Sequence, residues 1–162
     1  VQNCTKPMII DADGINALAG HMDEWERRRG RVTVLTPHEG EFLRVGGDLS
    51  QGRTAAAEDF ARRSGAVVVL KGPGTVVAGP DGRCRVNTTG NCGMAKGGSG
   101  DVLSGVVLAL LGLGMDAFDA CCCAVWLHGR AGDLAAQEKG QWGMTPTDLL
   151  EHLPQALREV TE

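Results

Sequence analysis

The sequence predicts an α/β fold, a three-layer α/β/α sandwich whose mostly parallel sheet carries an antiparallel hairpin. Short apolar runs alternate with helix-like segments along the chain. The first three of these runs are continuously apolar, which is typical of parallel strands that are covered on both faces. A turn sequence, Gly-Pro-Asp-Gly, separates two further strand-like runs and predicts a hairpin. The 162 residues fit a single domain.

The first half of the chain holds three strands and the helices between them. A strand is expected over residues 7–10, where an apolar run ends in Asp-Ala-Asp-Gly, and a helix over residues 15–22. The second strand, residues 32–35, stops at Thr-Pro-His-Glu and leads into a helix that ends near residue 45. An amphipathic helix follows over residues 54–64, with Gly65 as its C-terminal signal. Residues 66–70 form the most hydrophobic strand.

The second half holds the hairpin and the longest helices. The hairpin strands are expected over residues 75–78 and 83–86, and a polar glycine-rich loop over residues 88–100. Helices are expected over residues 101–111 and 116–138. Residues 145–161 are expected to form one or two further helical turns, broken at Pro154.

Charge and composition exclude several classes of protein. The formal net charge of −4 disfavours nucleic-acid binding. The basic run over residues 27–31 follows acidic residues and is interpreted as a solvated helix end. The longest uncharged stretch, residues 102–115, is too short to span a membrane, and no signal peptide is visible. The six cysteines include no C-x-x-C pair, which predicts free thiols, no zinc site and a cytoplasmic location.

Three polar loops are expected to meet where ligands bind in open α/β sheets, beyond the carboxyl ends of the parallel strands. They are residues 11–14, 36–40 and 71–75. In the first loop, Asp11 and Asp13 either cap the next helix, the favoured interpretation, or hold Mg²⁺ or a ribose. The third loop, which Lys71 opens, is a stiff turn against which a nucleotide could lie, or a plain turn into the hairpin.

The Thr-Pro-His-Glu loop has the pattern of a helix start. Thr36 as N-cap, Pro37 at the first helical position and Glu39 at the third would make a capping box. The same pattern returns at residues 145–148. Capping leaves His38 unexplained, so its side chain is expected to face the ligand crevice.

The segment from Gly97 to Gly100 precedes a wholly apolar helix. Its uncovered amides, together with the positive end of the helix dipole, predict an anion site. Asp101 follows directly, and it is either a base for a substrate hydroxyl or a partner of the helix dipole beside a Ser99 cap. The segment is not a Walker loop, because Lys96 precedes the glycines. His128, farther along, is interpreted as a packed core or surface residue.

Four motifs together resemble the NAD(P)H-hydrate dehydratase family of the ribokinase-like superfamily: DADG-IN-L, TPHEGEF, VVVLKGPGT and N-x-x-GN-x-GMAKGGSGDVLSG. The resemblance runs from about residue 7 to residue 154. It implies a ribokinase-like sandwich and the repair of NADHX and NADPHX, the hydrated forms of the reduced nicotinamide cofactors. The resemblance also implies ADP or ATP as co-substrate, with Mg²⁺. The phosphoryl group of the nucleotide would pass to the ring hydroxyl, and phosphate would then be expelled with help from the ring nitrogen.

The resemblance also implies roles for single residues. Asp101 corresponds to the base on the hydroxyl, and His38 to a substrate contact. The residues that correspond to the nucleotide site are Lys71, Gly72, Pro73, Gly74, Thr75, Asn91, Gly93, Met94, Gly97, Gly98, Ser99 and Gly100. The resemblance does not identify which residues would bind a metal ion. Family members are longer at the N-terminus, so residues 1–162 are expected to be the C-terminal part of a longer nucleotide-binding and catalytic domain. Family members also commonly form homo-oligomers, and the resemblance implies the same for this protein.

Two other functions fit the same residues. A sugar or vitamin-alcohol kinase of the superfamily would share Asp101 and the anion site but would release a stable phosphorylated product. A nucleotide-binding remnant would bind without turnover.

Overall fold

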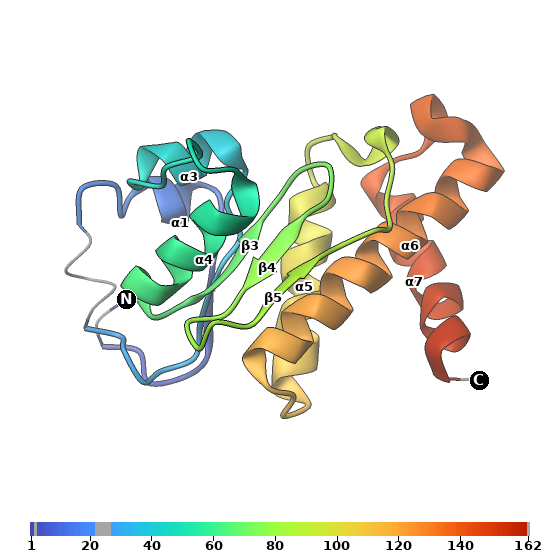
Figure 1. The fold of residues 1–162 in the computed structure, drawn as a ribbon. Coiled ribbons are helices and arrows are strands. Elements are labelled where there is room, and N and C mark those ends of the chain that lie inside the picture. The colour runs from blue at the N-terminus through green and yellow to red at the C-terminus, as the bar shows by residue number, and fades with distance from the viewer. Residues whose placement is uncertain (2, 22–26, 162) are drawn as a thin grey trace.

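The computed structural model describes residues 1, 3–21 and 27–161, and its strands form one five-stranded sheet in the order β1-β2-β3-β4-β5 (Figure 1). The strands are β1 (Met8–Ile10), β2 (Thr33–Leu35), β3 (Val67–Leu70), β4 (Val76–Ala78) and β5 (Cys84–Val86). The first three pair in parallel. β4 pairs antiparallel with β3 and with β5. The predicted parallel strands and hairpin are confirmed.

Helices cover both faces of this sheet (Figure 1). They are α1 (Asp13–Asn16), α3 (Glu39–Arg44), α4 (Arg53–Ser64), α5 (Ser99–Gly112), α6 (Ala117–Gly143) and α7 (Pro146–Thr161), with the 3₁₀ turn η1 (Cys92–Met94) in the glycine-rich loop. On β3, Val68 and Leu70 pack in the core beneath α3 and α4, while Val67 and Val69 pack beneath α5 and α6. Successive side chains of one strand thus enter opposite cores, which confirms the three-layer sandwich.

Several predicted helix boundaries are wrong. Instead of running over residues 15–22, α1 ends at Asn16, and Met22 lies outside the described residues. The long α6 continues to Gly143 across a non-helical Gly140. The predicted break at Pro154 does not occur, because α7 runs through this residue. Burial of its inner face against α6 holds α7 together where Pro154 removes one backbone hydrogen bond.

The basic run is only partly a solvated surface, because Arg28 is 2% exposed. Its guanidinium donates to the hydroxyl of Thr33 and to backbone carbonyls at Cys4 and Lys6. Arg29 donates to carbonyls at the end of α4. Arg28 therefore fastens the first residues of the chain to β2, a role that the local charge pattern does not reveal.

All six cysteines are free thiols. Cys121 is buried in the core between α6 and the sheet. Burial also raises the pKa of the Cys122 thiol to about 11. Such thiols behave as small apolar side chains rather than as nucleophiles.

Within residues 1, 3–21 and 27–161, no helix is both long enough and apolar enough to cross a membrane.

Candidate functional site

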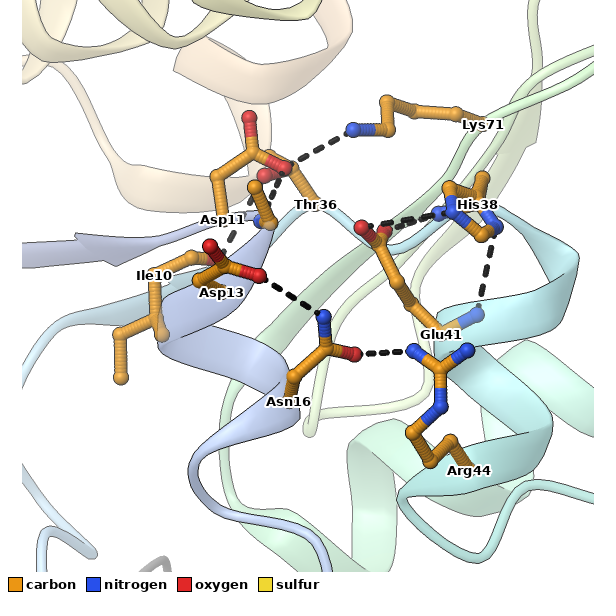
Figure 2. A network of polar contacts seen from close by, with 10 residues as sticks. Ile10, Asp11, Asp13, Asn16, Thr36, His38, Glu41, Arg44 and Lys71 are labelled. Carbon is orange, nitrogen blue, oxygen red and sulfur yellow. Dashed lines mark hydrogen bonds and ion pairs between the residues drawn. The ribbon is translucent and has the colours of Figure 1, made fainter.

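The carboxyl ends of the three parallel strands meet at one edge of the sheet, as the sequence predicts (Figure 2). Lys71, directly after β3, donates from Nζ to Oδ1 of Asp11, directly after β1, at 2.8 Å. Between them, after β2, the backbone of His38 bridges to Lys71 in parallel register. Residues about 60 positions apart therefore form one polar cluster.

Asp11 is the centre of this cluster and not a helix cap. Its Oδ2 accepts from the hydroxyl of Ser104 on α5 at 3.0 Å, in addition to the Lys71 bond. Burial acts to raise the pKa of Asp11, but the bond and charge of Lys71, with the hydroxyls of Thr36 and Ser104, hold it below the usual 3.8. The N-cap of α1 is Ala12, without a side-chain bond, so the favoured capping interpretation is wrong. Asp13 instead accepts from Asn16 (Figure 2).

The capping box of α3 lies two residues later than predicted. Its N-cap is His38, whose Nδ1 accepts from the amide of Glu41 at 3.2 Å, while the Glu41 carboxylate accepts from the His38 amide at 2.8 Å. The physical reason is that β-type pairing continues past β2. The Lys71 amide donates to the carbonyl of Pro37 at 2.8 Å, which keeps Thr36 and Pro37 extended.

The His38 side chain still points partly outward. It is 57% exposed, at the carboxyl end of β2, where a substrate contact was expected. A Cβ atom at Gly40 would lie 2.9 Å from its ring, so Gly40 makes room for this placement. Its Nε2 lies 3.4 Å from the Glu41 carboxylate, which orients the ring.

The loop from Lys71 to Thr75 is built against Arg53 of α4. Arg53 donates to the carbonyl of Leu70 at 2.9 Å and pairs with Glu39 at 2.5 Å. Gly72 has a φ of 149° and stands against the Arg53 guanidinium, where a side chain would clash. The Thr75 hydroxyl donates to the Gly72 carbonyl at 3.0 Å, and Pro73 and Gly74 are exposed. The loop is thus held in place by Arg53 on the side of α4, and it is open to solvent at Pro73 and Gly74.

The first part of the glycine-rich loop packs on α6 through some of its residues, while Gly90 and Cys92 are exposed. The Asn91 amide donates to the Gly132 carbonyl and to Asp133 at 3.0 Å each. A Cβ at Gly93 would lie 2.8 Å from the Cα of Gln141. Met94 packs with Met144 and Leu149 in the core between α6 and α7. Asn91, Gly93 and Met94, all expected near nucleotide, therefore have packing roles that account for their residue types.

Lys96 and Gly98 fasten the next part of the loop to the start of α7. The Lys96 ammonium donates to the carbonyls of Trp142, at 3.0 Å, and Met144. Gly98, with a φ of 95°, lies against Pro146. It is also the N-cap of α5, without a side-chain cap bond, so the alternative in which Ser99 caps the helix is wrong.

An open anion site remains at the first turn of α5. Within the described part of the chain, the amides of Gly97, Gly98, Gly100 and Asp101 have no hydrogen-bond acceptor. A Cβ at Gly97 would meet none of the described atoms within 4 Å, and one at Gly100 would lie 3.4 Å from Nζ of Lys71 and 3.6 Å from Oδ2 of Asp11. Free amides and the helix dipole thus lie beside the ion pair of Lys71 and Asp11, and the amides and dipole favour binding of a phosphate.

Asp101 stands exposed on this same first turn. Its carboxylate makes no hydrogen bond or ion pair with any described residue, in contrast to Asp11. It is therefore not engaged as a structural cap, and it is accessible to a ligand beside the open amides.

Sequence reasoning missed the part of α6 that supports the site. His128 lies partly buried with Nε2 at 2.9 Å from the carbonyl oxygen of Ser99. Burial lowers its pKa to about 4, against the opposing bond to Ser99. Gly129 and Gly132 let Thr89 and Met94 pack directly on the helix backbone. The one sequence signal for these roles is the presence of two glycines, Gly129 and Gly132, beside His128 in an otherwise good helix.

Acid should destabilise the protein through His128. Because its pKa is lowered in the fold, the unfolded chain takes up the proton first, near pH 6.5, and stability falls until about pH 4. Between pH 7 and pH 4 the loss is about 3 kcal/mol. His128→Gln should remove this part of the pH dependence in urea unfolding. Equal pH profiles for the parent and the variant would contradict the assignment.

The chain matches the protein family described as NAD(P)H-hydrate dehydratase over residues 1–155. The bifunctional NAD(P)H-hydrate repair enzyme Nnr of Thermofilum pendens is 47% identical over 161 residues, which are 97% of this chain and 30% of that protein. The ADP/ATP-dependent NAD(P)H-hydrate dehydratase of Bacillus subtilis, crystallised with ATP and Mg²⁺, is 34% identical with a TM-score of 0.82; the match covers 98% of this chain and 58% of that one.

A ribokinase-like superfamily protein of Enterococcus faecalis is 27% identical with a TM-score of 0.77, over 94% of this chain and 52% of that one. The ribokinase-like fold is thereby confirmed. The chain spans less than two thirds of the length of each of these relatives.

Proposed function

This chain belongs to the NAD(P)H-hydrate dehydratase family, and from that premise we propose that it carries the nucleotide-binding and catalytic residues of an enzyme that dehydrates NADHX and NADPHX. ADP or ATP is the co-substrate. The observation that carries the proposal is the first turn of α5, where amides with no acceptor among the described residues lie beside Lys71 and Asp101, whose carboxylate has no partner among the same residues. The relatives described as dehydratases and repair enzymes support the same reaction.

In the proposed reaction, Asp101 takes the proton of the ring hydroxyl. The hydroxyl oxygen at the same time attacks the terminal phosphorus of the nucleotide. The bond to the departing nucleotide breaks as the new phosphorus–oxygen bond forms. The carbon–oxygen bond of the phosphate ester then breaks, with help from the ring nitrogen lone pair. Phosphate leaves and a proton is lost from the neighbouring ring carbon, which restores the dihydronicotinamide. The α5 amides and Lys71 stabilise the charge on the transferred group.

The residues of the site fit a Mg²⁺ ion that is held mainly by the nucleotide. Among the described residues, no group of three or more His, Cys, Asp or Glu side chains could hold a metal. Magnesium at phosphate sites commonly takes one or two carboxylates and fills its other positions with phosphate oxygen and water. Asp11, Asp13 and Asp101 are carboxylates at this end of the sheet that could contribute. When bound, Mg²⁺ would neutralise phosphate charge.

Nucleotide should stabilise the fold. At 100 times its dissociation constant, ADP with Mg²⁺ is expected to add about 2.7 kcal/mol, which raises Tm by about 5–10 °C. Gly97→Asp should abolish this rise, because a carboxylate would occupy the open amides without a steric clash. The control is Gly105→Asp, which adds the same charge at an open position farther along α5. No shift in the parent, or an equal shift in both variants, would count against the site.

Turnover separates the three candidate functions. The parent is mixed with NADHX and either ADP or ATP, and NADH absorbance is followed. A rise in NADH with release of phosphate supports the dehydratase. A stable phosphorylated product would indicate the kinase, and nucleotide binding without product would indicate the remnant.

We propose further that the protein acts in the cytoplasm, that residues 1–162 belong to one nucleotide-binding and catalytic domain, and that the protein forms a homo-oligomer. Free thiols support the first, since they persist in a reducing compartment. Large exposed apolar side chains support the last: Leu113 is 80% and Trp142 98% exposed. Sedimentation velocity tests the oligomer.

A further inference from the structure

His128 has no role in the reaction proposed above, although it contacts the backbone of the anion site from α6. Its Nε2 lies 2.9 Å from the Ser99 carbonyl oxygen, at the first residue of α5. A carbonyl only accepts hydrogen bonds, so Nε2 must carry the ring proton and donate it. The lowered pKa, to about 4, keeps the ring neutral at pH 7, with Nε2 as its single donor.

The contact acts on a peptide group that faces the site. The Ser99 carbonyl and the Gly100 amide belong to one planar trans peptide, so a fixed carbonyl fixes the opposite direction for the N–H. That Gly100 amide has no acceptor within the described residues. A Cβ at Gly100 would lie 3.4 Å from Nζ of Lys71 and 3.6 Å from Oδ2 of Asp11. A bond to the carbonyl also polarises the peptide and strengthens its N–H as a donor.

Neighbouring contacts make α6 a firm support for this bond. Two residues before His128, the Trp126 carbonyl accepts from the Thr89 hydroxyl at 2.9 Å. Four residues after it, the Gly132 carbonyl accepts from the Asn91 amide at 3.0 Å. The loop that leads into α5 is therefore tied to the same stretch of helix. His128 adds the last tie, at the peptide that begins α5.

We propose that His128 is a positioning residue that aims and polarises the Gly100 N–H toward the phosphate of the nucleotide. This inference rests on the proposed function, because it assigns a second layer to the same anion site. His128 does not touch the nucleotide; it acts through the Ser99–Gly100 peptide.

The affinity test compares two replacements of His128. His128→Leu removes the donor and should weaken ADP binding about tenfold, the size expected for one lost hydrogen bond. His128→Gln can place an amide donor near the Nε2 position and should bind ADP within about threefold of the parent. Leu134→Ala, in the core between α6 and α7, is the control that lowers Tm without touching the loop. Equal losses for Leu and Gln, or an equal loss in the control, would overturn the proposal.

A second test needs no nucleotide. Nitrogen-15 NMR of the parent should show His128 as the Nε2–H tautomer, and His128→Leu should shift the Gly100 amide resonance more than that of Gly97. Glutamine should restore the Gly100 position. The Nδ1–H tautomer, or an unmoved Gly100 resonance, would overturn the positioning role. A parent with these signals that nevertheless binds no ADP would refute the proposed nucleotide site and, with it, the affinity role of His128.

Discussion

Replacing Asp101 with asparagine is expected to lower turnover at least a hundredfold while Tm changes little. A positioned carboxylate base contributes on the order of 10²–10⁴ in rate, and asparagine cannot accept the proton. The substitution breaks no hydrogen bond or ion pair among the described residues, so only the dipole contribution of about 0.3–1 kcal/mol is lost. Nucleotide affinity should hold or improve, because a negative charge leaves the anion site. The measurement is kcat at saturating NADHX and ADP.

Asp148 provides the matched control, because it too is an aspartate in the first turn of a helix. Its carboxylate accepts from the Thr145 amide at 2.7 Å and hydroxyl at 2.9 Å and pairs with Lys139. Lys139 foremost, then Thr145, lowers its pKa to about 2. Asp148→Asn should therefore lower Tm and leave turnover per folded molecule unchanged. If Asp101→Asn behaves like this control, or turns over within a few-fold of the parent, the proposed base is wrong.

The second large effect is expected at Gly129, where alanine should lower the free energy of unfolding by about 2–3 kcal/mol, even though alanine favours helix by about 1 kcal/mol. A Cβ there would lie 2.7 Å from the backbone carbon of Thr89 and 2.8 Å from its oxygen. Backbone atoms cannot rotate away as a side chain can, so the loop that leads to α5 must shift. ADP affinity should fall with stability. Urea unfolding and calorimetric titration measure the two effects.

The opposite sign is expected for the same substitution on α5. A Cβ at Gly105 would meet no described residue within 4 Å, and Gly105 is exposed in mid-helix. Gly105→Ala should therefore stabilise the protein by about 0.5–1 kcal/mol. If both variants change stability in the same direction, the close packing of Thr89 on α6 is not what Gly129 provides.

The sequence was enough to predict the sheet and the end of it that carries the site. Continuous apolar runs such as residues 66–70 are visible locally, because burial on both faces leaves no polar positions. Parallel strands then bring their carboxyl ends together, so the loops at Asp11, His38 and Lys71 had to meet. The glycines before α5 predicted free amides for a similarly local reason, since they leave the first turn uncovered.

Only the tertiary structure decided which polar and glycine residues pack and which stay free for a ligand. Arg28 is buried by the first residues of the chain, and Asn91 and Met94 are held by α6. The capping of α3 moved to His38 because pairing with Lys71 kept the strand extended. These contacts join positions far apart in the chain, whereas hydrophobic period and capping pattern report only on neighbours within a few residues. His128 therefore looked like an ordinary helix residue until the fold brought it against Ser99.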